Sequence, residues 1–166
     1  MGTPACALQP ASVTFARMTT ATGGGASPPR RVSLFVTCLI DQFYPEVGES
    51  VVNVLERLGV EVDFPREQTC CGQPAFSTGY FSDAQPVARR FLELFDGDDP
   101  IVVPSGSCGA MVRNFYVELF HDRPELQERA RRVGARVFEF SQFIVDVLGR
   151  AELGGKLSIS ATYHRC

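Results

Sequence analysis

The sequence has no long apolar run, few histidines and no nucleotide-binding fingerprint. No stretch approaches the ~20 apolar residues that a membrane-spanning helix requires, so we expect no transmembrane segment. No Gly-x-Gly-x-x-Gly follows a predicted strand, and no Gly-Lys-Ser/Thr follows the glycine run at 23–25. The two common phosphate-binding loops are therefore absent. The chain has 16 basic and 19 acidic residues, a net charge of −3, which argues against nucleic acid as a partner.

The 166 residues divide into a short leader and one domain. Hydrophobic residues make up 45% and charged residues 21% of the chain, a balance typical of a folded domain. Residues 1–31 carry arginines, glycines and prolines but no acidic residue, so we predict a flexible leader there. An organelle transit peptide is an alternative for this acid-poor start. Pro4 and Pro10 interrupt every candidate secretory core, and we expect a cytoplasmic protein.

Short apolar runs alternate with amphipathic stretches from residue 32 to residue 163. The apolar runs predict strands at 32–37, 60–64, 101–103, 136–138 and 157–163. The amphipathic stretches predict helices over 45–59, from an Asp83 cap to Gly97, over 111–120, from Pro124 onward and over 140–148. Strands that alternate with helices predict an α/β fold, a Rossmann-like, mainly parallel sheet with helices on both faces.

Four of the six cysteines follow predicted strands. Cys38 follows the first strand, Cys70 and Cys71 follow the second, and Cys108 follows the third. Loops beyond the carboxyl ends of neighbouring parallel strands open on one crevice, so we expect these four thiols to lie together. Soft thiolates gathered in this way suit an iron–sulfur cluster or zinc. The alternative for each single cysteine is a small buried apolar side chain.

Long intervals separate the cysteines, and a Cys-Cys-Gly triplet marks the middle position. There are 31 residues between Cys38 and Cys70, and 36 between Cys71 and Cys108. This pattern resembles the CCG cysteine-rich domain family, which occurs in the heterodisulfide reductase B subunit, the glycolate oxidase iron–sulfur subunit and the lactate-utilisation proteins. The segments Val-Thr-Cys-Leu-Ile-Asp at 36–41, Cys-Cys-Gly-Gln-Pro-Ala at 70–75 and Pro-Ser-Gly-Ser-Cys at 104–108 are most similar to the lactate-utilisation branch. The resemblance covers residues 32–163, which we expect to form one CCG domain.

The resemblance implies an iron–sulfur electron-transfer subunit of a complex that oxidises lactate or another 2-hydroxy acid. It implies Cys38, Cys70, Cys71 and Cys108 as ligands of a cluster, and four thiolates suffice for the 4Fe-4S type. It also implies two partners, a ferredoxin-like iron–sulfur subunit and a third lactate-utilisation subunit. Backbone N–H groups at 72–73 and 105–108 are candidates to donate hydrogen bonds to cluster sulfurs.

Two features depart from the family pattern. Some CCG domains end in Cys-x-x-Cys, whereas Met111 stands at the last position here, so a cluster type that needs a fifth cysteine is not expected. The family normally carries two such domains in tandem, and Tyr-His-Arg-Cys at 163–166 resembles the opening of the second. We therefore expect 164–166 to begin a second repeat that is missing from this chain. We also expect no oxidation of lactate by the chain alone.

Two other functions are consistent with the sequence. Cys108 lies between a strand and a helix in Gly-Ser-Cys-Gly-Ala, an arrangement similar to a nucleophile elbow, which predicts a hydrolase or thiol-transferase. Such an enzyme needs a base. His121 lies further along the same helix, ~20 Å from Cys108 at ~1.5 Å per residue, and His164 is the other candidate. Alternatively, four thiolates satisfy tetrahedral zinc in a structural or interaction domain.

Overall fold

A four-stranded sheet lies at the centre of the residues that the structure, a computed structural model, describes: 28–156, 158–160 and 162. The strands are β1 (Arg31–Leu34), β2 (Glu61–Asp63), β3 (Ile101–Val103) and β4 (Val137–Glu139). Every neighbouring pair is parallel, and the order across the sheet is β2-β1-β3-β4. The predicted α/β class is confirmed.

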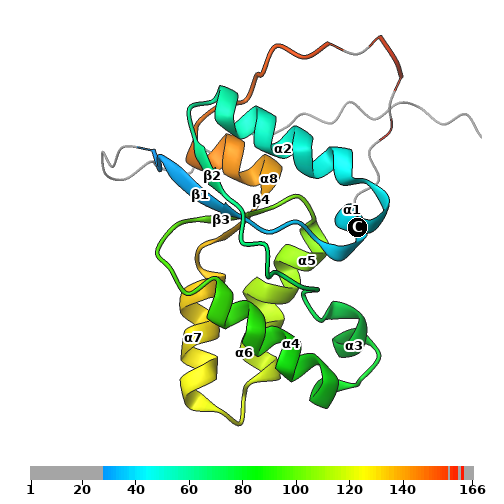
Figure 1. The fold of residues 1–166 in the computed structure, drawn as a ribbon, viewed down its shortest axis with the longest axis vertical. Coiled ribbons are helices and arrows are strands. Elements are labelled where there is room, and N and C mark those ends of the chain that lie inside the picture. The colour runs from blue at the N-terminus through cyan, green and yellow to red at the C-terminus, as the bar shows by residue number, and fades with distance from the viewer. Residues whose placement is uncertain (1–27, 157, 161, 163–166) are drawn as a thin grey trace, which may run out of the picture.

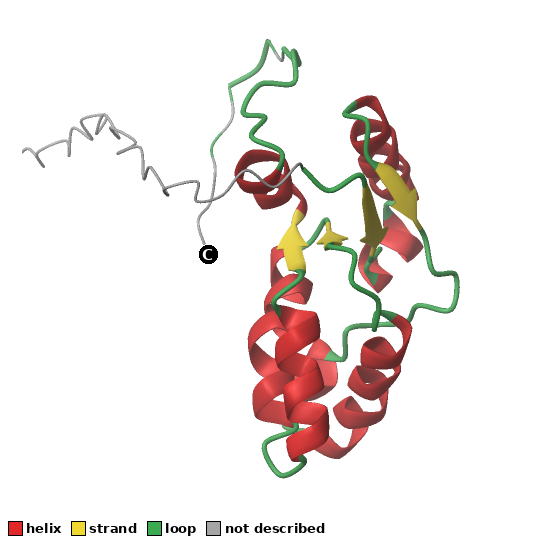
Figure 2. Cartoon of the chain, turned by 90° about the vertical axis from the view of Figure 1, so that its left-hand side faces the viewer, coloured by secondary structure: helices red, strands yellow, loops and turns green. Residues whose placement is uncertain are grey.

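Helices connect the strands and cover both faces of the sheet. After β1 come α1 (Cys38–Phe43) and α2 (Pro45–Arg57), and after β2 come α3 (Gln73–Ser77) and α4 (Phe81–Leu94). After β3 come α5 (Gly106–Ala110), the π-helix η1 (Met111–Phe115), α6 (Tyr116–Leu119) and α7 (Pro124–Gly134). After β4 come α8 (Phe140–Gln142) and the π-helix η2 (Phe143–Val147). In Figure 1, α2 and α8 lie above the sheet and α4, α6 and α7 below it, and Figure 2 shows the same layers from the side.

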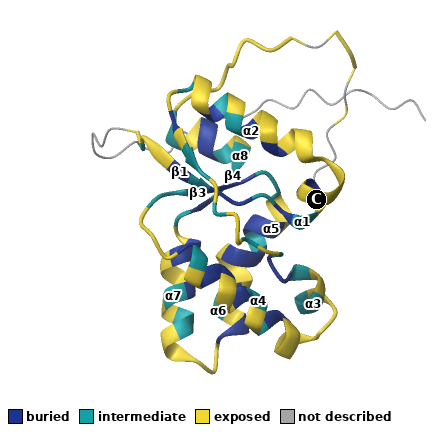
Figure 3. Cartoon of the chain, viewed as in Figure 1, coloured by how far each residue is buried: buried dark blue, intermediate teal, exposed yellow. Residues whose placement is uncertain are grey.

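The two central strands supply two separate hydrophobic cores. Val32 and Leu34 of β1 and Val102 of β3 pack on the side of α2 and η2. Ile101 and Val103 of β3 belong to the larger core, on the side of α4 to α7. Successive side chains of a strand point to opposite faces, so a strand made only of apolar residues buries both of its faces. Figure 3 shows the buried positions concentrated in these two interlayer regions.

The segment from α5 through η1 to α6 is one continuous helical run with a π turn in its middle. It begins at Gly106, five residues before the predicted start at 111. The predicted apolar stripe lies on this run. Met111, Val112, Tyr116, Leu119 and Phe120 are buried, and Phe115 is 38% exposed.

Two predicted boundaries need correction. The helix α4 begins at Phe81 with Tyr80 as its N-cap, so Asp83 lies in the first turn and is not the cap. An acidic side chain is also favoured there by the helix dipole, which is why the cap and first-turn positions are easily confused. The strand predicted over 32–37 ends at Leu34, and the N–H group of Val36 donates to the side chain of Gln68 and not to a neighbouring strand.

Neither end of the chain matches the sequence expectation fully. Arg31, predicted to be in the leader, is the first residue of β1 and forms ion pairs with Asp63 at 3.3 Å and Asp99 at 3.5 Å. In the predicted strand 157–163, the described residues 158–160 and 162 are exposed and belong to no strand, and Ile159, the apolar residue among them, is 68% exposed. The rest of the leader, 1–27, and the predicted repeat start at 164–166 lie outside the described residues. No helix in the described ranges is both long and apolar enough to cross a membrane.

Candidate metal centre

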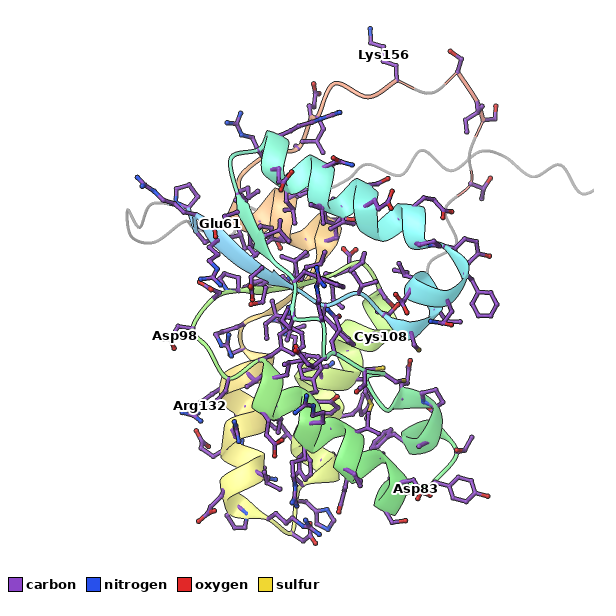
Figure 4. All side chains as sticks on the ribbon, in the orientation of Figure 1. Glu61, Asp83, Asp98, Cys108, Arg132 and Lys156 are labelled. Carbon is purple, nitrogen blue, oxygen red and sulfur yellow. The ribbon has the colours of Figure 1, made fainter. Side chains whose placement is uncertain are left out.

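The order of the strands brings the four cysteines to one edge of the sheet. From β1 the chain passes to β2 on one side and later to β3 on the other, and ligands of open α/β sheets bind beyond the strand ends at such a switch point. Cys38 is the first residue of α1, just after β1, and Cys70 and Cys71 lie in the loop between β2 and α3. Cys108 is the third residue of α5, after β3 (Figure 4).

The four thiols form two contacting pairs. In the outer pair, Cys38 and Cys70, the Sγ atoms are 3.6 Å apart and both side chains are partly exposed. In the inner pair, Cys71 and Cys108, the residues are only 2% and 8% exposed, and each thiol shifts the pKa of the other. The pairs also influence each other, since Cys38 lies within electrostatic reach of Cys108, and Cys71 within reach of Cys70. The structure thus brings together the four cysteines that the sequence singled out.

The inner pair is electrostatically asymmetric. The pKa of Cys108 is lowered to about 6, first because Cys71 donates a hydrogen bond to its sulfur and then because the hydroxyls of Ser105, Ser107 and Thr37 do the same. The pKa of Cys71 is raised, because its proton is held in that hydrogen bond and its side chain is buried. Without a bound metal, these opposite shifts favour the thiolate at Cys108 and the thiol at Cys71.

Fewer hydrogen-bond donors surround the sulfurs of the outer pair than that of Cys108. Burial raises the pKa of the Cys38 thiol, and the hydrogen bond with Cys70 raises it further. The backbone N–H of Gly72 donates to the Sγ of Cys70 over 3.4 Å. Gly72 has a φ of 82°, a left-handed conformation that glycine adopts without strain, so this turn requires glycine. Further N–H groups approach the sulfurs at Leu39, beside Cys38, and at Gln73, beside Cys71.

Two residues that hold the cysteine loops in place were missed by sequence reasoning. The Gln68 amide accepts from the N–H of Val36 at 2.8 Å and donates to the carbonyls of Leu34 at 3.3 Å and Pro65 at 2.8 Å. It thereby ties the end of β1 to the loop after β2. The buried Tyr116 hydroxyl donates to the carbonyl of Cys71 at 2.8 Å. Tyr116 was visible only as part of an apolar stripe, and no pattern in the sequence marks Gln68.

The described residues give Cys108 no catalytic base. The groups that lower the pKa of Cys108 are the Cys71 thiol and the hydroxyls of Ser105, Ser107 and Thr37. His121 is exposed beyond the end of α6, where its Nδ1 lies 3.0 Å from the carbonyl of Glu118. It lines a small hollow that none of the four cysteines borders. His164, the other candidate base, lies outside the described residues.

The donor set fits a thiolate-bound metal centre by its chemistry, since four sulfurs from three strand-to-helix connections meet at one edge. A tetrahedral zinc ion with ~2.3 Å bonds needs its four sulfurs within ~3.8 Å of one another. The outer pair meets this separation, but among the described residues no three His, Cys, Asp or Glu side chains surround one ion position. The thiols are thus close together without being arranged around a single point.

Comparison with known proteins identifies the class. The family described as "CCG: Cysteine-rich domain" matches residues 32–113, a range that contains all four cysteines. Residues 32–113 therefore match the CCG cysteine-rich domain, and the resemblance drawn from the motifs is confirmed.

Several relatives of this chain are named Lactate utilization protein A. The chain is 50% identical over 134 residues to Lactate utilization protein A of Geobacillus kaustophilus (strain HTA426). It is 51% identical over 134 residues to Lactate utilization protein A of Halalkalibacterium halodurans, and 46% identical over the same length to Lactate utilization protein A 1 of Bacillus mycoides (strain KBAB4). These matches cover 81% of this chain but 56%, 54% and 55% of the relatives, respectively. The chain thus spans about half the length of the curated relatives it matches.

Proposed function

We propose that Cys38, Cys70, Cys71 and Cys108 hold one iron–sulfur cluster of the 4Fe-4S type. Through this cluster the chain serves as an electron-transfer component of a cytoplasmic system that oxidises lactate. The chemistry of the four thiols supports the cluster, and the name shared by the relatives, Lactate utilization protein A, supports the substrate.

The observation that carries the proposal is the distribution of the four thiols. They contact in two pairs, and the sulfurs of the described residues do not close around one ion. A cluster takes its thiolates on different iron atoms, so its ligands surround a body of several atoms. Four thiolates at one edge suit such a cluster, and the metal and sulfide analysis described below separates it from a single zinc ion.

The surroundings of the thiols suit electron transfer. When bound, such a cluster accepts and releases one electron at a time, at a potential set by hydrogen bonds to sulfur and by burial. The N–H groups of Gly72 and Gln73 and the hydroxyls near Cys108 already point at thiol sulfurs. Donors of this kind stabilise the more negative, reduced state. The partly exposed outer pair gives a partner access to this edge.

We further propose two partners, a ferredoxin-like iron–sulfur subunit and a third lactate-utilisation subunit. The chain itself has no dinucleotide fingerprint, so it offers no site of that kind to take a hydride from lactate. In this proposal the electrons reach the chain from another component. We expect the purified chain alone not to turn over lactate with an artificial acceptor.

The test is anaerobic purification of the full chain, followed by measurement of iron, acid-labile sulfide and zinc. We expect a coloured protein that contains iron and sulfide in equal amounts and bleaches on reduction with dithionite. Cys→Ser substitution at 38, 70, 71 or 108 should each remove most of the iron. A colourless protein with one zinc per chain would instead establish the zinc domain.

The matched control is Cys6→Ser, because Cys6 lies in the predicted leader. This variant should keep its full iron content. Iron retained in the Cys70→Ser variant would argue against shared ligation by the four thiols. Selective alkylation of Cys108 in a protein that never takes up metal would support the nucleophile function.

A further inference from the structure

A polar hollow lies beside the edge strand β4, across α5 from the cysteines. It has a volume of about 210 Å³ and is bordered by α5, by η1 and by the start of α8. Gly106 and Gly109 line one side of it, Arg113 and Asn114 another, and Gln142 a third. The strand order places β4 next to β3 on the side away from β1, so this hollow is separate from the cysteine centre.

The hollow offers hydrogen-bond donors and one positive charge. Among the described residues Arg113 has no carboxylate within ion-pair distance, and its one side-chain partner is the Oε1 of Gln142 at 3.4 Å. The amide nitrogens of Asn114 and Gln142 donate to no described side chain or carbonyl. These three side chains therefore have N–H groups available for a ligand.

The one carboxylate at the hollow is already engaged. Glu139, the last residue of β4, accepts from the N–H of Ser141 at 2.8 Å and from the N–H of Gln142 at 3.2 Å. It thereby caps the first turn of α8. Its negative charge is directed to that helix start, so Glu139 does not neutralise Arg113 through a direct ion pair.

The backbone that carries Arg113 is held in place. Arg113 and Asn114 belong to the π turn η1, and π turns inside helices are rare and frequent at functional sites. Gly134 of α7 packs directly against this turn, since a Cβ at that position would lie 3.2 Å from the Cα and carbonyl oxygen of Arg113. The backbone from which the Arg113 side chain extends is thus held between two helical segments.

From these observations we infer that the hollow binds a small carboxylate. The carboxylate group would pair with the Arg113 guanidinium, and the amides of Asn114 and Gln142 would donate to the remaining oxygens. The small volume favours a ligand of few atoms. The choice of lactate as the probe rests on the proposed function, whereas the carboxylate chemistry rests only on these residues.

The test is equilibrium dialysis of the full chain, as purified, against radiolabelled lactate. Lactate should bind at one site, and unlabelled propionate should compete with it, because both carry the carboxylate. Methyl lactate, which has no charge, should not compete. Arg113→Met should weaken lactate binding by about tenfold or more, and Arg113→Lys, which keeps the charge, by less. Gln142→Leu should weaken it independently of Arg113.

A matched control is Arg90→Met. Arg90 is also exposed, and with Arg89 and Arg123 it lines a larger hollow of about 420 Å³ on α4. Its substitution should leave lactate binding unchanged. The inference is overturned if wild-type chain binds no lactate, if Arg90→Met rather than Arg113→Met weakens binding, or if phosphate displaces lactate more strongly than propionate does. Iron content, measured on the same samples, tests the proposed function separately, because neither result depends on the other.

Discussion

The outer and inner cysteine pairs differ in what holds them. The inner pair, Cys71 and Cys108, lies in the larger hydrophobic core. The outer pair, Cys38 and Cys70, is partly exposed and rests on loops that the Gln68 amide joins. The same four thiols thus combine a rigid, buried half with a more open half. In the proposed cluster site, burial would influence the potential and exposure would give a partner access.

The largest loss of stability should come from a cavity in the hydrophobic core that contains the inner pair. Phe91 packs against Phe95 with ring centroids 4.4 Å apart, against Phe35 at 4.9 Å and against Tyr116 at 5.7 Å. Phe91→Ala should lower the free energy of unfolding by ~3–5 kcal/mol, because it leaves a cavity in this core. Urea denaturation measures the change.

The control for that substitution lies on α1, the helix that begins at Cys38. Phe43, at the end of α1, is 69% exposed. Phe43→Ala should change the free energy of unfolding by less than ~0.5 kcal/mol, as most surface substitutions do. Equal losses for the two variants would contradict the contrast between a buried and an open half.

A smaller effect is expected at Tyr116. Tyr116→Phe keeps the ring but removes the hydroxyl that donates to the carbonyl of Cys71. The buried carbonyl then loses its partner, and the free energy of unfolding should fall by ~1–2 kcal/mol. Urea denaturation of this variant beside wild type checks the value. An unchanged midpoint would show that water replaces the hydroxyl.

Much of this architecture was predictable from the sequence, and what was not has physical causes. Cys38, Cys70, Cys71 and Cys108 each follow a predicted strand, and the carboxyl ends of parallel strands lie at one edge of a sheet. The order of strands and cysteines along the sequence therefore predicted that the four thiols lie together. The short helix α3 was missed because its five residues contain no full apolar period. The Gln68 amide was missed because its hydrogen bonds join segments more than 30 residues apart.

The two pairs should also differ under oxidation. In the metal-free chain, oxidised glutathione should convert the outer pair to a disulfide: two thiols lose two electrons and two protons, and the glutathione disulfide is reduced to two thiols. The Cys38 and Cys70 sulfurs need to approach only from 3.6 Å to ~2.0 Å, and both are partly exposed. Peptide mapping after differential alkylation identifies the product.

Dithiothreitol should reverse that disulfide, and Cys38→Ser should prevent it. The inner pair should remain reduced under the same conditions, because its thiols are shielded from the reagent. A disulfide between Cys71 and Cys108 that forms first would contradict the assignment of outer and inner pairs.

The smallest effect concerns ionisation of the inner pair. Consider a metal-free chain that keeps Cys71 and Cys108 and has Ser at every other cysteine position. In this chain the Cys108 thiol should titrate with a pKa of about 6. It should thus be protonated at pH 5 and a thiolate at pH 7. Cys71→Ala removes the main donated hydrogen bond and should raise that pKa. The ultraviolet absorbance of the thiolate, followed against pH, gives both midpoints; a wild-type midpoint near the ordinary ~8.5 would contradict the hydrogen-bond network.

The central claim is that four thiolates hold one iron–sulfur cluster. X-ray absorption at the iron and zinc edges of the anaerobically purified chain tests it most directly. The account predicts iron bound by sulfur alone, with a second shell of scattering from neighbouring iron atoms. Zinc with a single shell of sulfur at ~2.3 Å, and no iron, would contradict it.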